Sequence, residues 1–256
     1  YTWRIKDSPV QVKRSLTIYV KPDSCMGSFL VSLYKHIHHS DSMDAIILAG
    51  GQGKRLRPLT DGIPKCMVPL NGKPMLQYNI NLLKKYKIEK IVIACGYMWE
   101  KIKHHYGNSL VYSVEDEPLG TAGAVRRALD HVESEEFLIV NADDLSNLDI
   151  DKLAKIKSNV TVVSRFHCQF GLVKIADNKI VEFVEKPLLP HWANIGTHIL
   201  NKRINFPERG SLEADVLPKI AQKGQLKVFK HKGFCVTVNV QKDIEEAEKT
   251  LRKHGL

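Results

Sequence analysis

The sequence contains no apolar run of about 18 residues or more, so it predicts no transmembrane helix. Residues 1–14 are charged and have neither the apolar stretch nor the small-residue cleavage site of a signal peptide. The five cysteines are scattered, odd in number and free of CxxC spacing, which argues against a disulfide framework or a zinc site. These absences predict a soluble protein of the reducing cytoplasm, without a membrane partner.

Aromatic residues make up only 7% of the chain, and no basic stretch is interleaved with them. The formal net charge of +10 suits either a nucleic-acid binder or an enzyme that handles triphosphates and sugar phosphates. Lys and Arg are spread along the chain without a DNA-reading motif, so we expect no nucleic-acid partner. The 256 residues, 43% of them hydrophobic, are enough for one main domain.

The pattern divides the chain at Met43. Residues 1–42 contain a strand-like piece at 16–20, a turn at 22–23 and a helix-like piece at 28–37, too little for an independent core. We therefore expect residues 1–42 to be an N-terminal appendage of unknown role, with a remnant of another domain or an artefact as alternatives, followed by one main domain at residues 43–256.

Strand-like and helix-like segments alternate from Met43 to Asn141, and the strands are short and continuously apolar. Such strands suit a mostly parallel sheet with both faces covered, so the prediction is a doubly wound, Rossmann-like α/β fold. After Asn141 the chain becomes rich in strands, which indicates a sugar-binding half. The predicted strands are 45–48, 90–95, 110–114, 136–140, 160–166, 171–175, 180–184, 193–200, 226–229 and 235–240; the predicted helices are 74–86, 99–106, 121–132, 211–221 and 243–253.

A glycine loop follows the first strand of this domain. In an open parallel sheet, ligands bind beyond the carboxyl ends of the strands. Gly50, Gly51 and Gly53 allow close backbone approach and expose N–H groups, while Lys54 and Arg55 bring cationic donors to a bound anion. The loop therefore predicts polyphosphate binding.

Two familiar phosphate loops are excluded by spacing. A GxxxxGK[ST] loop needs glycine at position 48 and serine or threonine at position 55, where the chain has Leu48 and Arg55. A GxGxxG fingerprint needs glycine at position 56, which is Leu56.

A second chemical group follows the apolar strand at 136–140. Asp143 lies where that strand ends, at the same edge of the sheet as the glycine loop. Mg²⁺ in nucleotide sites uses one or two protein oxygens, so Asp143 with one partner would suffice. Its neighbour Asp144 is the alternative ligand, although it is better suited to capping the next helix.

The chain resembles the sugar-phosphate nucleotidyltransferase family from residue 43 to about residue 250. The motifs that carry this resemblance follow in family order. They are LAGGQGKRLRPLT at 48–60, PKCMVPLNGKPM at 64–75, EPLGTAGA at 117–124, NADD at 141–144, FVEKP at 183–187, NIG at 194–196 and SLEADVLP at 211–218.

The resemblance implies an enzyme that joins a nucleoside triphosphate to a sugar 1-phosphate and releases pyrophosphate. It implies catalytic roles for Arg55, Lys65 and Asp143, with the first two holding phosphates. It also implies a set of nucleotide-binding positions, namely Leu48, Ala49, Gly50, Gly51, Gly53, Lys54, Gly120 and Thr121. Arg and Lys at this edge can neutralise the charge of phosphoryl transfer, which needs positioning more than covalent help.

The predicted cofactor is Mg²⁺, held by Asp143 and Asn239. Many relatives have Asp-(Ile/Val)-Gly-Thr before the last helix, whereas this chain has VNVQ at 238–241. An amide oxygen at Asn239 can ligate Mg²⁺ but brings no charge. The missing Gly-Thr pair also alters the local loop.

Four residues are predicted to bind the sugar phosphate: Gly171, Glu185, Lys186 and Asn194. A carboxylate suits sugar hydroxyls and an ammonium suits the phosphate, which is how the family uses the Glu185–Lys186 pair. Taken without the resemblance, an exposed ion pair is the alternative interpretation.

The EPLGTAG form at 117–123 is similar to the mannose-1-phosphate and heptose-1-phosphate guanylyltransferase branches, which favours GTP and a manno-configured sugar. Thymidylyl, uridylyl and cytidylyl specificity remain alternatives. A catalytically weak regulatory subunit that binds sugar nucleotides is another, motivated by Asn239.

The sequence leaves the oligomeric state open, and a homo-oligomer is possible. The eleven histidines show no metal-ligand spacing and are interpreted as surface residues.

Overall fold

The computed structural model describes residues 2–5, 8–9, 16–20 and 43–256. The chain forms two compact units, Tyr1–Ser42 and Met43–Leu256. In the first unit, the predicted strand at 16–20 is β3, and the sheet order is β2-β1-β3. The predicted turn at 22–23 and helix at 28–37 lie outside the described residues. The bounds of the first two strands are β1 (Thr2–Ile5) and β2 (Ser8–Pro9), and those of the third are β3 (Leu16–Val20).

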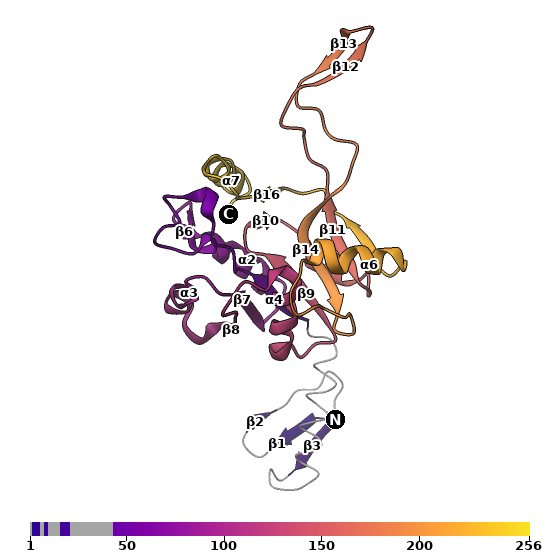
Figure 1. Cartoon of the computed structure of the whole chain (residues 1–256). Coiled ribbons are helices and arrows are strands. Elements are labelled where there is room, and N and C mark those ends of the chain that lie inside the picture. The colour runs from indigo at the N-terminus through magenta and orange to yellow at the C-terminus, as the bar shows by residue number, and fades with distance from the viewer. Residues whose placement is uncertain (1, 6–7, 10–15, 21–42) are drawn as a thin grey trace. The chain divides into compact units, whose positions relative to one another are not determined.

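A seven-stranded sheet forms the centre of the second unit, in the order β15-β11-β14-β9-β4-β7-β8 (Figure 1). At its middle, β4 (Asp44–Leu48) pairs in parallel with β7 (Ile91–Cys95) and with β9 (Glu136–Asn141). Next to β7, β8 (Val111–Val114) is also parallel. All five residues of β7 are buried, as expected for a strand covered on both faces.

Helices cover both faces of the sheet, as two neighbouring residues of β4 show. Ile47 packs with the buried side of α2 (Met75–Lys85) and α3 (Trp99–Tyr106), whereas Ile46 packs with α4 (Gly120–Ala128). Successive side chains of a strand point to opposite faces, so β4 needs an apolar residue at each position. The predicted doubly wound α/β fold is confirmed.

The half of this unit after Asn141 is rich in strands, as predicted. In it, β14 (Ala193–Asn201) runs antiparallel to both β9 and β11 (Val160–Ser164), while β15 (Lys227–Lys230) forms the edge parallel to β11. The strand predicted to run to residue 240 ends earlier, because β16 (Cys235–Thr237) pairs with β10 (Asp144–Ser146) and the chain then turns. The seven-stranded sheet is mixed, because β14 runs opposite to the strands on both of its sides.

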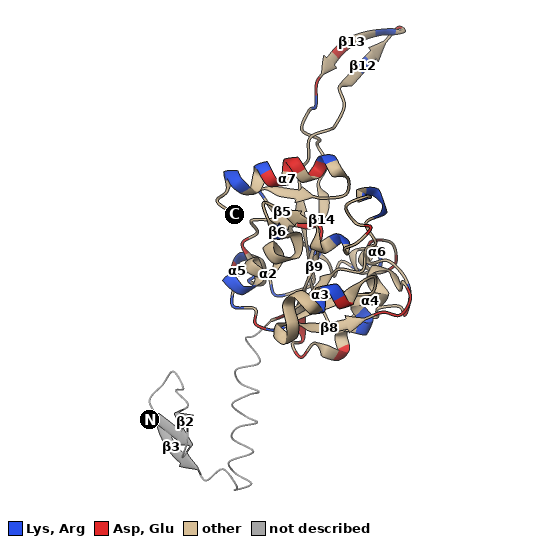
Figure 2. Cartoon of the chain, turned by 90° about the vertical axis from the view of Figure 1, so that its left-hand side faces the viewer, with Lys and Arg blue, Asp and Glu red and all other residues tan. Residues whose placement is uncertain are grey.

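The C-terminal helix α7 (Gln241–Lys253) closes the unit. Its Ala247 and Leu251 are buried with Leu56, Leu70 and other apolar residues of a third cluster. Figure 2 shows charged residues along the outer side of this helix, which is the amphipathic pattern of a surface helix. The remaining short elements are β5 (Pro69–Leu70), β6 (Lys73–Pro74), α5 (Ile150–Ala154) and α6 (Leu217–Gln222), with single-turn helices at Lys54–Leu56, Lys65–Met67, Gly107–Ser109, Leu129–His131 and Leu212–Val216.

A long arm, residues 165–192, joins β11 to β14. It carries β12 (Leu172–Ala176) and β13 (Lys179–Val184), which pair with each other. Both views show these strands extending away from the seven-stranded sheet (Figures 1 and 2). No helix in the described part of the chain has the length and apolarity needed to cross a membrane.

His198 corrects the interpretation of the histidines as surface residues. It lies in β14 and is only 1% exposed. Among the described residues, no hydrogen-bond partner reaches either of its ring nitrogens. Burial lowers the pKa of His198 to about 4, with the charge of Glu213 opposing the change. The alternation of side chains along a strand predicts which face of the sheet a residue lies on, but not whether other elements cover that face. The sequence therefore could not show that His198 is buried.

We expect His198→Leu to raise the free energy of unfolding at pH 7 by about 1–2 kcal/mol, because it removes two buried polar atoms without partners. The unfolded chain takes up a proton that the folded chain excludes, so His198 lowers stability as the pH falls from about 6.5 toward 4. The advantage of the variant should therefore grow on acidification. Urea unfolding of variant and wild type at pH 7 and pH 5 measures both effects.

The exposed His104 supplies the control, His104→Leu, which should change stability by less than about 0.5 kcal/mol at either pH. Other groups titrate in the same range, so the difference between variant and wild type is the quantity to compare. An advantage that shrinks at pH 5 would contradict the assignment.

Candidate functional site

The glycine loop begins directly after β4, at the carboxyl edge of the sheet. Gly53 has φ +64°, and a Cβ there would lie 2.9 Å from a side-chain carbon of Thr60 and 3.0 Å from Cβ of Lys65. The Thr60 hydroxyl donates to the Gly53 carbonyl at 2.8 Å. The loop is thus folded tightly against the segment that carries Lys65, and only glycine fits this turn without strain.

Glu115 is a site residue that the sequence analysis missed. It follows β8, and a Cβ on Gly50 would lie 2.5 Å from its Oε1. Its Oε2 accepts a hydrogen bond from the Leu119 backbone N–H at 2.9 Å. A carboxylate directly after a half-buried strand at the same edge of the sheet was the available signal. Glu115 joins the glycine loop to the EPLGTAG segment.

Four predicted residues meet at one point. The Lys65 ammonium forms an ion pair with Asp143 Oδ2 and donates to Asn239 Oδ1 at 2.8 Å. The Arg55 guanidinium donates to the same Asn239 oxygen at 3.1 Å. The side chains of Lys65 and Asp143 are 13% and 26% exposed, so the pair is largely shielded but reachable. Two cations and two oxygen donors therefore face each other across the loop.

Backbone contacts hold these side chains in place. The Ala142 N–H donates to the Leu48 carbonyl at 3.0 Å, and the Val238 N–H donates to the Asp143 carbonyl at 3.0 Å. Asp243, in the first turn of α7, accepts from the Asn239 N–H at 2.7 Å. Beside the cluster is a small cavity of about 80 Å³. Its lining residues are Leu48, Ala49, Gly51, Lys65, Cys66, Ala142 and Asp143.

Asp144, the alternative ligand, has other partners. Its carboxylate accepts hydrogen bonds from the Thr237 hydroxyl and from the Asn141 amide at 2.9 Å. Burial and the charge of Asp143 raise the pKa of Asp144 to about 6. The suggestion that Asp144 caps the next helix is wrong, because Asp144 begins β10 and pairs with β16.

Another aspartate caps that helix. Asp149 accepts from the Lys152 N–H at 3.0 Å and caps α5. Gly196 of β14 lies against the Asp144 group, since a Cβ there would be 2.3 Å from Asp144 Oδ2.

Gly120 and Thr121, predicted to bind nucleotide, begin α4. Gly120 has φ +76°, and a Cβ there would lie 2.3 Å from the Gly210 carbonyl oxygen. The Thr121 hydroxyl accepts from the Leu212 N–H at 2.7 Å and donates to Glu213 at 3.1 Å. In this structure the two residues join α4 to the segment before α6.

The four predicted sugar-phosphate residues divide between β14 and the arm, where Gly171 and Glu185 are neighbours: a Cβ on Gly171 would lie 2.9 Å from Glu185 Oε2. Asn194 lies in β14, where its Oδ1 accepts from the Gly196 N–H at 3.0 Å. Gly171, Glu185 and Lys186 belong to the arm instead. Glu185 and Lys186 form a 3.9 Å ion pair with side chains 64% and 63% exposed. As the structure stands, that pair faces solvent and takes no part in the Lys65–Asp143 cluster.

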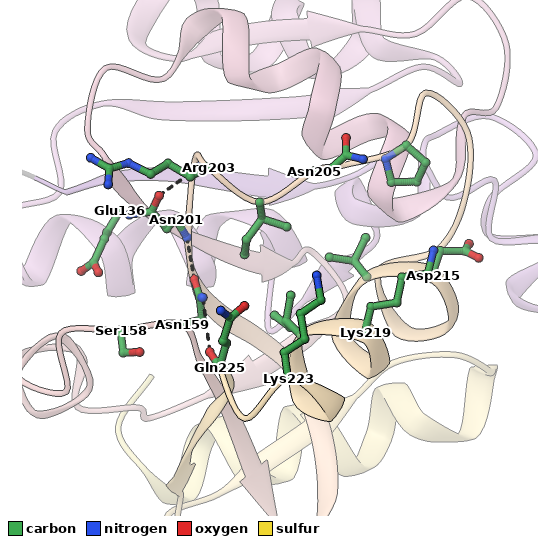
Figure 3. Close-up of a pocket in the computed structure, with 14 residues that line it drawn as sticks. Glu136, Ser158, Asn159, Asn201, Arg203, Asn205, Asp215, Lys219, Lys223 and Gln225 are labelled. Carbon is green, nitrogen blue, oxygen red and sulfur yellow. Dashed lines mark hydrogen bonds between the residues drawn. The ribbon is translucent and has the colours of Figure 1, made fainter.

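A second cavity, of about 730 Å³, lies at the other edge of the sheet, near Glu136 at the beginning of β9 (Figure 3). Its lining includes Lys219, Lys223 and several amide side chains, among them Asn159, but none of the predicted site residues. The cluster at the carboxyl edge is therefore the candidate active site.

Metal binding must rest on few ligands. Within the described residues, no three His, Cys, Asp or Glu side chains are grouped so that they could hold a metal ion. The Asp143 carboxylate and the Asn239 amide oxygen nevertheless converge on one cation, the Lys65 ammonium. Two hard oxygen donors around one positive charge fit the protein share of a Mg²⁺ site, whose other ligands are water and phosphate.

Comparison with known proteins identifies the family of this chain. The profile of the nucleotidyl transferase family matches residues 44–232. The D-glycero-alpha-D-manno-heptose 1-phosphate guanylyltransferase of Aneurinibacillus thermoaerophilus is 32% identical over 229 residues, covering 83% of this chain and 100% of the relative. The bifunctional protein GlmU of Methanocaldococcus jannaschii is 36% identical over 223 residues, covering 82% of this chain and 54% of GlmU.

Solved structures agree with the sequence comparison. The crystal structure of HddC from Yersinia pseudotuberculosis is 29% identical, with a TM-score of 0.67, and the match covers 82% of this chain and 99% of HddC. HddC has also been solved in complex with GMP-PN, with the same TM-score of 0.67. The chain belongs to the nucleotidyl transferase family and is a sugar-phosphate nucleotidyltransferase, an enzyme, as its motifs predicted.

Proposed function

We propose that the enzyme transfers GMP from GTP to a mannose- or heptose-type sugar 1-phosphate and releases pyrophosphate. The observation that carries this proposal is the meeting of Arg55, Lys65, Asp143 and Asn239 beside the glycine loop. The heptose guanylyltransferase relative and the HddC complex with GMP-PN support the choice of base. The EPLGTAG segment supports the manno-type sugar.

In the proposed reaction, a phosphate oxygen of the sugar 1-phosphate attacks the α-phosphorus in line with the departing pyrophosphate. N–H groups of the glycine loop bind the triphosphate, and Arg55 and Lys65 stabilise the negative charge of the leaving group. No general base is needed, because a phosphate monoester has its second pKa near 6 and is already mostly dianionic at neutral pH. Alignment of the two substrates is the main task of the protein.

We propose that Asp143 and Asn239 hold the Mg²⁺ ion, which when bound supplies charge neutralisation at the triphosphate. Lys65 contacts both residues, so its ammonium would compete with the ion for the same two oxygens. Asp144 is the weaker choice of ligand, because Thr237 and Asn141 already bind its carboxylate.

The uncharged Asn239 should weaken metal binding. We expect Asn239→Asp to lower the Mg²⁺ concentration for half-maximal activity by about tenfold, since a second carboxylate adds charge to the site. Titration of activity with Mg²⁺ at saturating substrates measures this. The exposed Asn108 supplies the control, Asn108→Asp, which should leave the titration unchanged. An unchanged curve for Asn239→Asp would remove Asn239 from the metal site.

A pyrophosphate-release screen tests the function. Five nucleoside triphosphates are combined with the 1-phosphates of glucose, mannose, N-acetylglucosamine and heptose in the presence of Mg²⁺. Turnover with GTP and a manno-configured sugar supports the proposal, and turnover with UTP, TTP or CTP would replace the assigned base. The GlmU relative is the reason to include N-acetylglucosamine.

The second candidate is a regulatory subunit that binds sugar nucleotides with little turnover, favoured by Asn239 and the absent Gly-Thr pair. In that case GTP or a GDP-sugar would raise the melting temperature, while no combination in the screen would release pyrophosphate.

A further inference from the structure

The arm exposes a group of apolar side chains to solvent. Val173 pairs with Phe183 and, beyond a register shift after Lys174, Ile175 pairs with Ile180. Directly paired residues of antiparallel strands share a face, so each pair exposes its two apolar side chains together. These four side chains are between 43% and 66% exposed. The pairs on either side of Val173–Phe183 are the charged pair Lys174–Glu182 and the apolar pair Leu172–Val184, whose side chains are 45% and 41% exposed. Figure 2 shows β12 and β13 mostly without charge.

Such a hairpin needs a partner surface. A two-stranded hairpin alone is marginally stable in water, and soluble monomers rarely expose clustered apolar side chains. Within the part of the chain that the structure describes, β12 and β13 pair only with each other. Something else must cover the Val173–Phe183 side.

The base of the arm directs it away from its own sheet. Ser164 of β11 pairs with Ala193 of β14, and the pairing continues outward. The Leu189 N–H donates to the Phe166 carbonyl at 2.9 Å, and the Cys168 N–H donates to the Pro187 carbonyl at 2.8 Å. This ladder extends the arm outward from β11 and β14 as far as Cys168 and Pro187.

Charge favours a protein surface as the partner. The arm has four cations and three carboxylates, whereas the whole chain has a formal net charge of +10. A nearly neutral, apolar surface suits a protein interface better than a polyanion. Because the arm is nearly neutral, two copies of this basic chain can meet through their arms without strong electrostatic repulsion.

In the candidate site, Lys65 and Asp143 bind each other, whereas Glu185 and Lys186 on the arm are exposed. Glu185 and Lys186 follow β13 directly, and the proposed function needs a carboxylate and an ammonium for the sugar 1-phosphate. We propose that two copies of this chain exchange arms about a two-fold axis. Each arm then brings Glu185 and Lys186 to the carboxyl edge of the sheet in the partner subunit, beside Asn194. The assignment of these two side chains rests on the proposed function, whereas the dimer itself does not.

The dimer is tested by mass in solution. Wild type should have twice the mass of one chain by light scattering after size exclusion, and the double variant Ile175→Glu, Phe183→Glu should have the mass of one chain. Lys174→Gln, in the adjacent charged pair, should remain dimeric. These side chains are exposed, so melting of the body should stay unchanged in each variant. A monomeric wild type would overturn the proposal.

Exchange of the arms is tested by complementation. Asp143→Ala and Lys186→Ala are each expected to be inactive as homodimers. In the mixed dimer, coexpressed with two different tags and purified through both, one site combines an intact body with the intact arm of the Asp143→Ala chain. That dimer should recover about half of wild-type activity per dimer, because one of its two sites is complete.

Failure of the two proposals can be told apart. If each arm serves its own chain, the mixed dimer has no complete site and stays inactive, which overturns the exchange while wild-type turnover upholds the proposed function. If wild type shows no turnover with any substrate pair, the proposed function fails, and the light-scattering result alone decides whether the arm joins two copies.

Discussion

Asp143→Asn is expected to lower kcat for pyrophosphate release by about 10³-fold or more, the largest effect of any single substitution in this chain. The asparagine keeps an oxygen near Lys65 but removes the only full negative charge among the proposed metal ligands. GTP should still raise the melting temperature, because the glycine loop and Arg55 are intact. Steady-state pyrophosphate release with a thermal-shift assay measures both quantities.

Asp151 on α5 is exposed and serves as the control, since Asp151→Asn removes the same charge at a position that makes no contact with Lys65 or Asn239 among the hydrogen bonds and ion pairs of the cluster. Asp144→Asn should behave differently again and lower stability, because one amide oxygen cannot replace two carboxylate oxygens as acceptors for Thr237 and Asn141. If Asp143→Asn retains activity within about tenfold of wild type, Asp143 is not the main metal ligand.

Lys65→Met is expected to reduce kcat by about 10²–10³-fold, equivalent to about 3–4 kcal/mol of transition-state stabilisation. The ammonium lies between Asp143 and Asn239, close to the glycine loop, where the departing pyrophosphate gains charge. Because that charge develops during transfer, kcat should fall more than the affinity for GTP. Kinetics with GTP varied at saturating sugar phosphate separate the two quantities.

Lys73 of β6 is an exposed lysine and supplies the matched control, Lys73→Met, which should leave both constants near wild type. A Lys65→Met variant with unchanged kcat and a raised KM would show that Lys65 contributes uniform binding rather than catalysis. That outcome would move the stabilising role to Arg55.

Most of the fold could be predicted because its signals are local. The apolar run before Gly50 predicted β4, and the periodicity of residues 74–86 predicted α2, each within one or two residues of its observed ends. Side-chain alternation in a strand and the 3.6-residue period of a helix depend on neighbours in sequence, so one chain reveals them.

The features that the sequence did not show depend on contacts between distant segments. Lys65 and Asn239 are separated by 174 residues, and neither has a local pattern that shows the hydrogen bond between them. The burial of His198 depends on both layers above β14, and the partners of Asp144 come from β9 and β16. The early end of β16 follows from the hydrogen bond of Val238 to Asp143.

The sequence by itself determined the doubly wound sheet, the glycine loop after its first strand and the family, because residue types at fixed short spacings encode each of them. Only the tertiary structure decided that Arg55, Lys65, Asp143 and Asn239 share one point, and that Glu185 lies on an arm apart from them. The physical reason is that packing and strand pairing between distant segments set these positions, and the energies of such contacts leave no periodic trace in the chain.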